Sequence, residues 1–452
     1  MQVTIVAANA FRFDSRLRRT ALALAGDGHT IAIVAFREAG LPDLERLDDR
    51  ITVHRVDLDR RIRAGLRPLP DFLVDAVLWA LGIDTDAVVL PAAQGGRRAR
   101  FLGPLRRSLE IWANLRRSRP WRDAVLRVGG GADVFHAKAL VALPVIRAAA
   151  AARGARFVYD IADLHSEAAR LARMPGPVRW LIRRRERSLL HGVAATFAVS
   201  DAVADRAAAW FRIARPTVVR NMPERWRGDE PLPDVPRRLS EAAGLAPTTR
   251  VILYQGGLSV DRGIEELVVA LDQEPLVSAD VAAVFLGYGR LEGWLRSEAK
   301  RRPGRMAVVD PVAPAELLPW TASADVSYIG FPPRTLNLRL ALSNKLYESA
   351  MAGVPVIVAA GTEHARVVAR DGLGSVTDVE DPRALGAAIL ELLDEEPGGR
   401  LARRLRMRRR ALETDNWQVE SQAVVRAYRN LGKGRVGHDQ AAPAAARGTE
   451  AT

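Results

Sequence analysis

Two charged side chains near residue 345 have the types and the spacing to hold a ligand that carries phosphates and a ribose. Lys345 and Glu348 lie three residues apart, so a short helix would place both on one face. The cation can meet phosphate oxygens, and the carboxylate can accept hydrogen bonds from two sugar hydroxyls. The same spacing also suits an ordinary ion pair on a solvated helix face, and spacing alone does not decide between the two.

Two further loops could bring backbone close to the same ligand. Each follows an apolar strand-like segment, and paired glycines there allow close approach to a diphosphate, which a neighbouring arginine can neutralise. A tight turn would use such glycines as well. The loop residues are Gly256, Gly257, Arg262, Gly287 and Gly289. Neither half of the chain carries the Gly-x-Gly-x-x-Gly dinucleotide fingerprint after its first strand.

Strand-like segments alternate with helical periodicity along two runs of the chain, which predicts an α/β protein with parallel, doubly wound sheets. The predicted strands are Val3–Ala8, Thr30–Ala35, Val134–Ala137, Arg156–Asp160, Thr196–Val199 and Thr217–Arg220, then Val251–Gln255, Ala282–Phe285, Met306–Val309, Val326–Phe331, Val354–Ala359 and Ser375–Asp378. Because ligands bind beyond the carboxyl ends of parallel strands, the three loops above should converge there.

Proline and charge content divide the chain further. We expect a first domain over 1–221, a proline-rich linker over 222–249 and a second domain over 250–414. A helix over 415–431 should pack back across the domains, and the tail over 432–452 reads as disordered. The chain enters its first strand directly, and its most apolar window falls short of the roughly 20 residues of a membrane span. We therefore expect a cytoplasmic protein.

The composition favours anionic partners. Apolar residues make up 48% of the 452 residues, which suffices for sizeable cores in two or three domains. The net charge of +14 comes almost wholly from arginine, since lysine stands only at 138, 300, 345 and 433. Nucleotides or acidic lipid would suit this charge, although a coding bias toward arginine would produce it as well. The absence of cysteine excludes disulfides and thiolate catalysis.

One basic segment, 97–127, has ten arginines and two acidic residues with large apolar side chains between them. This pattern suits an amphipathic helix on an anionic membrane surface, or else a helix whose apolar side packs on its own domain. A second basic run, Arg400 to Arg410, reads as a solvated helix face. Nucleic acid is disfavoured, because neither run places base-stacking aromatics in a sheet pattern.

Together these motifs resemble the retaining family 4 glycosyltransferases, whose GT-B architecture sets two Rossmann-like domains across a cleft. The matching residues of the second half are Gly256-Gly257, Asp261–Leu267, Gly287–Gly289, and Asn337 through Asn344–Glu348 to Gly353–Pro355. Those of the first half are Asp14–Arg16, Leu24, Gly28-His29, Ala132–His136, Tyr159-Asp160, Val199-Ser200 and Asn221–Pro223. The resemblance spans nearly the whole ordered chain and indicates the family without indicating a substrate.

The resemblance implies transfer of a sugar from a nucleotide-sugar to a saccharide or lipid-linked acceptor, with retention of configuration and without metal or cofactor. Cell-envelope or exopolysaccharide synthesis at the inner face of the membrane would fit. The implied donor-binding residues are Gly256, Gly257, Arg262, Gly287, Gly289, Ser343, Asn344, Lys345 and Glu348. Arg262 and Lys345 would stabilise the departing diphosphate, and Glu348 would hold the ribose. Asp14, Arg16 and His136 would lie on the acceptor side.

The loop after the strand at 156–160 departs from the family pattern. Many relatives have a histidine where this chain has Ala162, and another where it has Lys138. His165 could substitute, or it could fill an aromatic position often found there. The candidates for catalysis are therefore Asp163, His165 and Lys138, while a histidine placed as His136 is more often a strand-end residue bonded to backbone than a catalyst.

The second half departs from the pattern at one position. Leu340 stands where many relatives have a glutamate, eight residues before Glu348. A subgroup with a small-Asn-Lys turn commonly lacks that glutamate, and Ser343 occupies a position where that subgroup often has proline. This chain fits the subgroup.

Two other functions compete with transfer. A scaffold that retains the fold would bind the donor without turning it over, and Ala162 with Lys138 motivates this alternative. A nucleotide-sugar epimerase of the same architecture would need acid and base groups on both sides of the sugar. A chain with seven histidines and this depleted loop supplies few of them.

Overall fold

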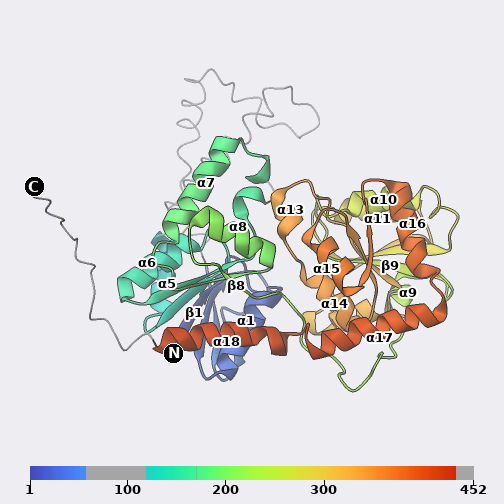
Figure 1. Ribbon diagram of the computed structural model, residues 1–452. Helices are drawn as coiled ribbons and strands as arrows, with labels where there is room; N and C mark the ends of the chain where they lie inside the picture. Colours follow the sequence, from blue (N-terminus) through green and yellow to red (C-terminus); the bar gives the residue numbers. More distant parts are fainter. Residues whose placement is uncertain (58–118, 169–170, 434–452) are drawn as a thin grey trace, which may run out of the picture.

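The computed structural model describes residues 1–57, 119–168 and 171–433 and contains two α/β domains, each built on one sheet (Figure 1). The first sheet has strand order β3-β4-β2-β1-β5-β6-β7-β8, and the second has order β11-β10-β9-β12-β13-β14. All described strand pairs are parallel except β3 with β4. The doubly wound α/β architecture predicted from the sequence is confirmed.

The elements have the following bounds. The strands are β1 (Gln2–Val6), β2 (Thr30–Phe36), β3 (Leu44–Asp48), β4 (Ile51–Val56), β5 (Val134–Ala137), β6 (Arg156–Ile161), β7 (Ala195–Ala198), β8 (Thr217–Val218), β9 (Arg250–Gly257), β10 (Val281–Tyr288), β11 (Met306–Val309), β12 (Val326–Ile329), β13 (Val356–Ala359) and β14 (Gly374–Thr377). The helices of the first domain are α1 (Ser15–Gly26), α5 (Arg119–Val128), α6 (Leu143–Arg153), α7 (Gly176–Leu189) and α8 (Asp201–Phe211), with 3₁₀ turns η2 (His165–Glu167) and η3 (Leu171–Arg173). Those of the second are α9 (Arg238–Ala243), α10 (Ile264–Leu271), α11 (Glu292–Arg301), α12 (Leu317–Ala322), α13 (Leu336–Leu340), α14 (Asn344–Ala352), α15 (Glu363–Asp371), α16 (Pro382–Leu393) and α17 (Pro397–Glu413), with η4 (Pro314–Glu316), and α18 (Trp417–Lys433) follows.

Helices cover both faces of each sheet, which explains the apolar character of the central strands. In β9 the run from Val251 to Tyr254 is fully buried, and β1 is buried from Val3 to Val6. The antiparallel hairpin of β3 and β4 was not predicted. Its outer strand alternates half-buried with exposed side chains, so β3 lacks the apolar run by which the other strands were recognised.

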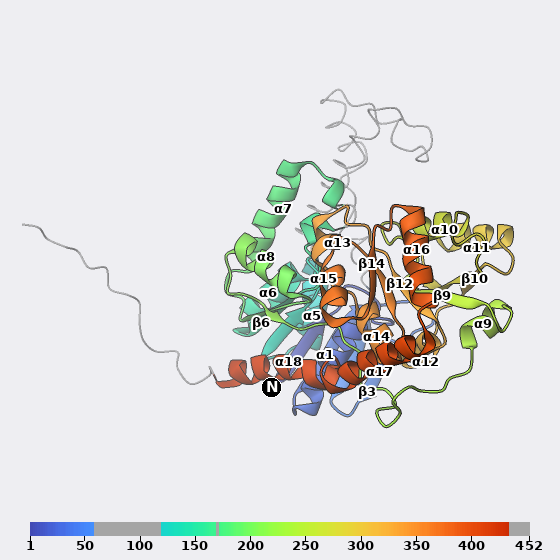
Figure 2. The ribbon, with the colours of Figure 1, turned by 45° about the vertical axis from the view of Figure 1, so that its right-hand side comes forward.

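Two segments of the chain cross between the domains next to each other. The Trp417 N–H donates to the Pro223 carbonyl at 2.7 Å, and the Arg225 N–H donates to the Gln418 side chain at 3.0 Å. Helix α17 lies along the second domain and α18 along the first, as the two views agree (Figure 2). Trp417 and Tyr428 join the core beneath β1 and β2, so α18 returns the chain to the first domain.

The basic run from Arg400 to Arg410 lies in α17, and it is not wholly the plain solvated helix face that the sequence predicted. Arg408 is fully buried. Its guanidinium donates to the carbonyl oxygens of Trp226, Arg227, Glu230 and Met351. An arginine can satisfy several carbonyls at once because it carries five N–H donors. Arg408 therefore fastens the predicted linker to the second domain.

Helix α18 supplies a test of how the first domain is held together. The Tyr428 hydroxyl lies 2.8 Å from His136 Nδ1, and both residues are fully buried. Tyr428→Phe leaves that nitrogen without a partner, which should lower the free energy of unfolding by about 1–3 kcal/mol in urea titrations. Val419→Ala, at an exposed position of the same helix, should change it by less than about 0.5 kcal/mol. Equal effects of the two substitutions would contradict this account.

Candidate functional site

Two cations lie near one aromatic ring at the carboxyl ends of the second sheet. The Arg262 guanidinium lies 4.9 Å from the centre of the Phe331 ring, and Lys345 Nζ lies 5.5 Å from it. Arg262 precedes α10, and Lys345 lies in the first turn of α14. Neither cation forms a salt bridge within the part of the chain that the structure describes. The ring face attracts both charges but does not neutralise them.

The environment of Lys345 is poised for an anion. Burial, with a contribution from the neighbouring Arg262 charge, lowers the pKa of Lys345 to about 8, and Glu348 opposes the shift. The amino group also lies at the amino-terminal end of α14, where free N–H groups and the helix dipole favour negative charge. A bound diphosphate would relieve the repulsion between the two cations.

Glu348 is held in place by two amides rather than by a cation of its own domain. Gln255 Nε2 donates to one carboxylate oxygen at 2.9 Å, and Asn344 Nδ2 donates to the other at 2.7 Å. Gln255 is fixed in turn by the Thr321 hydroxyl, which donates to its carbonyl oxygen at 2.7 Å. Each carboxylate oxygen keeps acceptor capacity, which is the property needed to bind vicinal hydroxyls.

The turn before α14 is anchored by a histidine that sequence reasoning missed. The Ser343 N–H donates to His364 Nε2 at 2.9 Å, and the Ser343 hydroxyl lies 3.1 Å from the same nitrogen. Nε2 can accept only when it is unprotonated, so His364 is neutral and carries its proton on Nδ1. Burial lowers the pKa of His364 to about 3, helped by the charges of Lys345 and Arg262.

The glycines bring the strand ends together beneath the cations. A Cβ on Gly256, whose φ is +112°, would lie 2.9 Å from Lys345 Cε. A Cβ on Gly287 would lie 1.9 Å from the Gly256 carbonyl oxygen, so any side chain there would push β9 from β10. A Cβ on Gly257 would point into open space, whereas a Cβ on Gly289 would clash with the backbone of Leu258. Glycine at 256 therefore leaves room for the lysine, and glycine at 287 keeps the strands close.

On the first domain, Lys138 and Asp14 form a pair. Lys138 Nζ lies 2.7 Å from both carboxylate oxygens of Asp14. Asp14 also caps α1 by accepting from the Leu17 N–H, and it accepts from Asn9. The Asp14 carboxylate is thus occupied by its own domain, and its effect is to fix Lys138 at the end of β5.

His165 is likewise used for structure. Its Nε2 accepts from the Leu140 N–H at 3.2 Å, which ties the loop after β6 to the loop after β5. Burial lowers the pKa of His165, against the opposing effect of Asp163. These contacts fit the alternative in which His165 fills a packing position. Asp163 remains half-buried, at the side of the first domain that meets the second.

The expected positions of Arg16 and His136 are wrong. Arg16 is 4% exposed and makes a bidentate contact with Asp160 at 2.5 and 2.7 Å, with a third bond to the Val219 carbonyl. His136 is fully buried beneath α18, and burial lowers its pKa to about 4. Both side chains hold the first domain together, so neither is offered to an acceptor.

A different arginine of α1 approaches the donor-side residues. Arg19 donates to the Asn221 side chain at 2.9 Å, and its charge interacts with Glu348 and Glu224. Burial lowers the pKa of Arg19 against the effect of both carboxylates. It lies one helical turn after Arg16, so the helix period puts it near the same face, a signal that the sequence already contained.

Contacts between the domains surround these residues. The rings of Phe13 and Tyr288 lie 5.3 Å apart, and Arg173 donates to Asp261 at 2.9 Å. The Ser200 hydroxyl donates to the Leu340 carbonyl at 2.7 Å. The strand ends of both sheets therefore face each other, with the donor-side residues on one side and Lys138 and Asp163 on the other.

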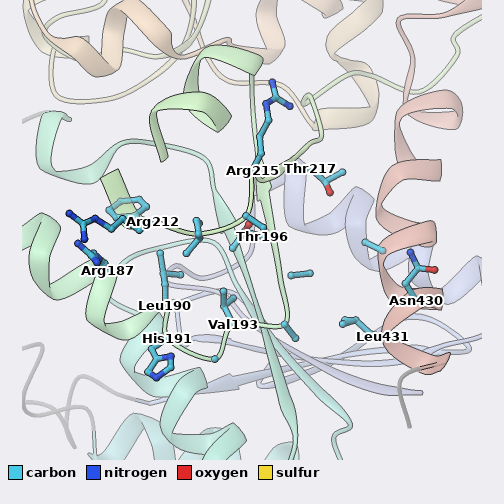
Figure 3. A pocket seen from close by; sticks show the side chains of 17 residues that line it. Arg187, Leu190, His191, Val193, Thr196, Arg212, Arg215, Thr217, Asn430 and Leu431 are labelled. Carbon is cyan, nitrogen blue, oxygen red and sulfur yellow. The ribbon is translucent and has the colours of Figure 1, made fainter. Parts of the chain in front are cut away.

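A hollow of about 830 Å³ lies elsewhere, at the opposite ends of the first sheet (Figure 3). It is lined from the end of α7, the start of β7, the end of α8 and the end of α18, with Arg187, Arg212 and Arg215 among its side chains. Arg215 is engaged by Asp201 and Asp205. The hollow contains none of the residues described above and is separate from the site.

Comparison with known proteins defines the class. Several solved structures match nearly the whole chain at low identity. The sucrose-phosphate synthase of Thermosynechococcus elongatus has a TM-score of 0.66 at 14% identity and covers 96% of this chain and 100% of its own. The Anabaena protein HepE in complex with UDP and glucose has a TM-score of 0.63 at 15% identity, with 95% and 100% covered. The chain thus has the GT-B fold.

The second domain also matches known proteins by sequence. Residues 249–395 match the family model described as glycosyl transferases group 1. A glycogen synthase from Anaeromyxobacter sp. (strain Fw109-5) is 28% identical over 191 residues, which are 41% of this chain and 38% of that protein. The matched stretch therefore spans less than two fifths of that relative. A glycosyl transferases group 1 domain within a GT-B fold is the class to which these features point.

The two buried neutral histidines, His136 and His364, predict how the free energy of unfolding depends on pH. Above pH 6.5 both imidazoles are neutral in the folded and unfolded chain, and between 6.5 and about 4 only the unfolded chain takes up their protons. The free energy of unfolding should therefore fall with acidification, by up to about 1.4 kcal/mol per pH unit for each histidine. In urea titrations from pH 4 to 7, His364→Ala should show a shallower slope than the wild type. The exposed His191→Ala should keep the wild-type slope, and identical slopes for all three proteins would refute the assignment.

Proposed function

We propose that this protein is a glycosyltransferase that moves a sugar from a nucleotide-sugar donor to an acceptor hydroxyl. The observation that carries the proposal is the pair of cations, Arg262 and Lys345, held over Phe331 without a salt-bridge partner among the described residues. Glu348 lies three residues along the same helix with acceptor capacity to spare. A nucleoside diphosphate has the charges and the hydroxyls that this arrangement lacks.

The reaction would proceed at the junction of the two domains. The bond between the anomeric carbon and the diphosphate oxygen breaks, and a bond from that carbon to the acceptor oxygen forms. Arg262 and Lys345 stabilise the charge that develops on the departing diphosphate, so the two side chains supply the positive charge without a metal. The acceptor hydroxyl gives up its proton to a base, for which Asp163 is the candidate.

The finer features of the proposal rest on the motif resemblance. They are retention at the anomeric carbon, a saccharide or lipid-linked acceptor, and a place in cell-envelope or exopolysaccharide synthesis. HepE, which shares the fold, is described in complex with UDP and glucose, and UDP-glucose is therefore the first donor to test. Thermal shift across a panel of nucleotide-sugars would identify the donor, because a ligand that binds only the folded state stabilises it.

Calorimetric titration with UDP tests the donor site. We expect wild-type protein to bind UDP, and we expect Lys345→Met and Glu348→Ala each to weaken binding by about 10- to 100-fold, since each removes a charged hydrogen-bond partner. Glu391→Ala, at an exposed position of α16, is the matched control and should bind like the wild type. Failure of the wild type to bind any nucleotide or nucleotide-sugar would refute the proposal.

One set of observations favours the non-catalytic alternative. The Lys138 charge is paired with Asp14, and the three histidines that precede or flank the site, at 136, 165 and 364, are all used for structure. A scaffold would bind the donor and leave it intact. Turnover with any acceptor, abolished by Lys345→Met, would exclude this alternative.

The end of the predicted membrane segment forms helix α5 of the first domain. Of 97–127, only residues from 119 onward lie within the described residues, and there α5 packs Trp121 and Val125 into its own domain. The Trp121 ring lies 5.1 Å from Phe36. The remainder of the segment lies outside the described residues. Among the described helices, none has both the length and the apolar character to cross a membrane.

Helix α7 offers a second surface that could contact an anionic membrane. Trp180 is 51% exposed and Leu181 is 46% exposed, with the Arg184 guanidinium 5.3 Å from the Trp180 ring. Arg184, Arg185 and Arg187 have no carboxylate partner among the described residues. Glu186 is buried, and burial raises its pKa to about 8 despite the bond from Tyr159, so the helix presents only positive charge. A basic helix with exposed tryptophan and leucine suits the interface of an anionic bilayer.

Vesicle co-sedimentation tests this surface. Binding to phosphatidylglycerol vesicles should exceed binding to phosphatidylcholine vesicles and should fall with added salt. Trp180→Ala with Leu181→Ala, and separately Arg184→Gln with Arg185→Gln, should each reduce the bound fraction at least about twofold. Trp294→Ala in α11, a tryptophan of comparable exposure on the second domain, is the control. Unchanged sedimentation of both α7 variants would remove the helix from the proposal.

A further inference from the structure

The short helix α13 of the second domain packs against the first domain. Leu336 and Leu340 of α13 pack against the core formed by β5, β6 and β7, whereas Leu338 belongs to the core of the second domain. The Leu340 carbonyl accepts the hydroxyl proton of Ser200, which is itself fully buried at the start of α8. Helix α13 therefore divides its side chains between the two cores.

Asn337 makes the most specific of these contacts. Its Nδ2 donates to Asp163 Oδ1 at 2.9 Å, and its carbonyl oxygen accepts from the Leu164 N–H at 2.8 Å. A carboxylate only accepts and a backbone N–H only donates, so the two partners fix the orientation of the amide. Asn337 is 7% exposed, and a single side chain thus holds both the candidate base and the backbone that follows it.

The same segment of chain continues directly into the donor-side turn. From Asn337 it runs through Leu340 to Ser343, which His364 anchors, and then to Asn344 and Lys345. Its first half lies on the first domain, and its second half carries the residues that we assign to the donor. The contacts of Lys345 and Glu348 do not include Asn337, so the donor side can form without it.

We propose that Asn337 is a positioning residue that sets Asp163 against the donor side when the two domains meet. Its amide holds the carboxylate at the carboxyl end of β6, and its place eight residues before Lys345 ties that position to the donor turn. The catalytic consequence rests on the proposed function, whereas the contact between the domains does not.

The test pairs a distance measurement with kinetics. The chain has no cysteine, so Ala152→Cys in α6 and Ala242→Cys in α9, both at exposed positions, can carry one spin label on each domain. Double electron–electron resonance then reports the separation of the domains with and without UDP. The variants are Asn337→Ala, Asn337→Asp, Asp163→Asn and the double exchange Asn337→Asp with Asp163→Asn. Arg339→Ala, an exposed neighbour on α13, is the control.

We expect Asn337→Ala and Asn337→Asp to lengthen or broaden the distance distribution, the latter because two carboxylates then face each other. The double exchange should restore the wild-type distribution, since an amide at 163 can donate to a carboxylate at 337. Calorimetric binding of UDP should stay within about twofold in all variants, because the donor contacts are separate. With UDP-glucose as donor, Asn337→Ala should lower kcat by about 10- to 100-fold at unchanged donor KM.

The results of these experiments distinguish the positioning role of Asn337 from the proposed function. Wild-type distances in both single variants at 337, or no recovery in the double exchange, would overturn the positioning role, as would unchanged kcat where the wild type turns over. A wild type that binds no nucleotide contradicts the proposed function, and the distance distributions still decide the role of Asn337.

Discussion

The structure around residue 345 depends on one electrostatic constraint: two cations, Arg262 and Lys345, each lie within 5.5 Å of the centre of the Phe331 ring, and no described carboxylate forms a salt bridge with either. Burying a cation and placing a second cation near it both cost free energy, and burial first and the Arg262 charge second lower the pKa of Lys345. The neighbouring groups do not neutralise these two charges and add no further positive charge. His364 stays neutral, Gly256 leaves room for the lysine, and Glu348 is oriented by amides instead of being drawn into an ion pair. An anionic ligand is the partner that this arrangement lacks.

The first domain supports that site through its internal contacts. Several of its polar side chains are engaged in internal contacts: Arg16 with Asp160, Lys138 with Asp14, and the neutral His136 with Tyr428. These bonds fix the strand ends that face the second domain. Arg19 and Asp163 interact with the second domain. Helices α13 and α18 also connect the two domains.

The sequence was enough to predict the architecture, because parallel strands buried on both faces leave long apolar runs and their loops must converge. Strands β5 and β11 begin and end where predicted. The hairpin of β3 and β4 was missed, since its outer strand lacks such a run. The contacts of Arg16 and Arg408 could not be predicted either, because their partners are distant in the chain. The partners of Arg16 lie 144 and 203 residues away, and those of Arg408 lie up to 182 residues away.

The candidate donor-side residues could be recognised in the sequence for a different reason, and their role stays a prediction. Lys345, Glu348, Arg262 and the glycines carry their own local pattern, and the fold brings them together. Two residues that fix the neighbouring loops have no such pattern: His364 anchors the turn at Ser343, and Asn337 holds Asp163 on the first domain. Each acts through a backbone N–H of another loop, a contact that no spacing rule reveals. Sequence reasoning therefore selected residues with the chemistry to touch a ligand and missed the roles of residues that fix the loops around them.

The central claim, that Arg262, Lys345 and Glu348 form a nucleotide-binding site, is tested most directly by a crystal structure of the protein with UDP. The account predicts diphosphate oxygens within hydrogen-bonding distance of Lys345 Nζ and the Arg262 guanidinium, with the ribose hydroxyls on Glu348. A nucleotide bound elsewhere, for example beside Arg212 in the hollow at the far end of the first sheet, would contradict it.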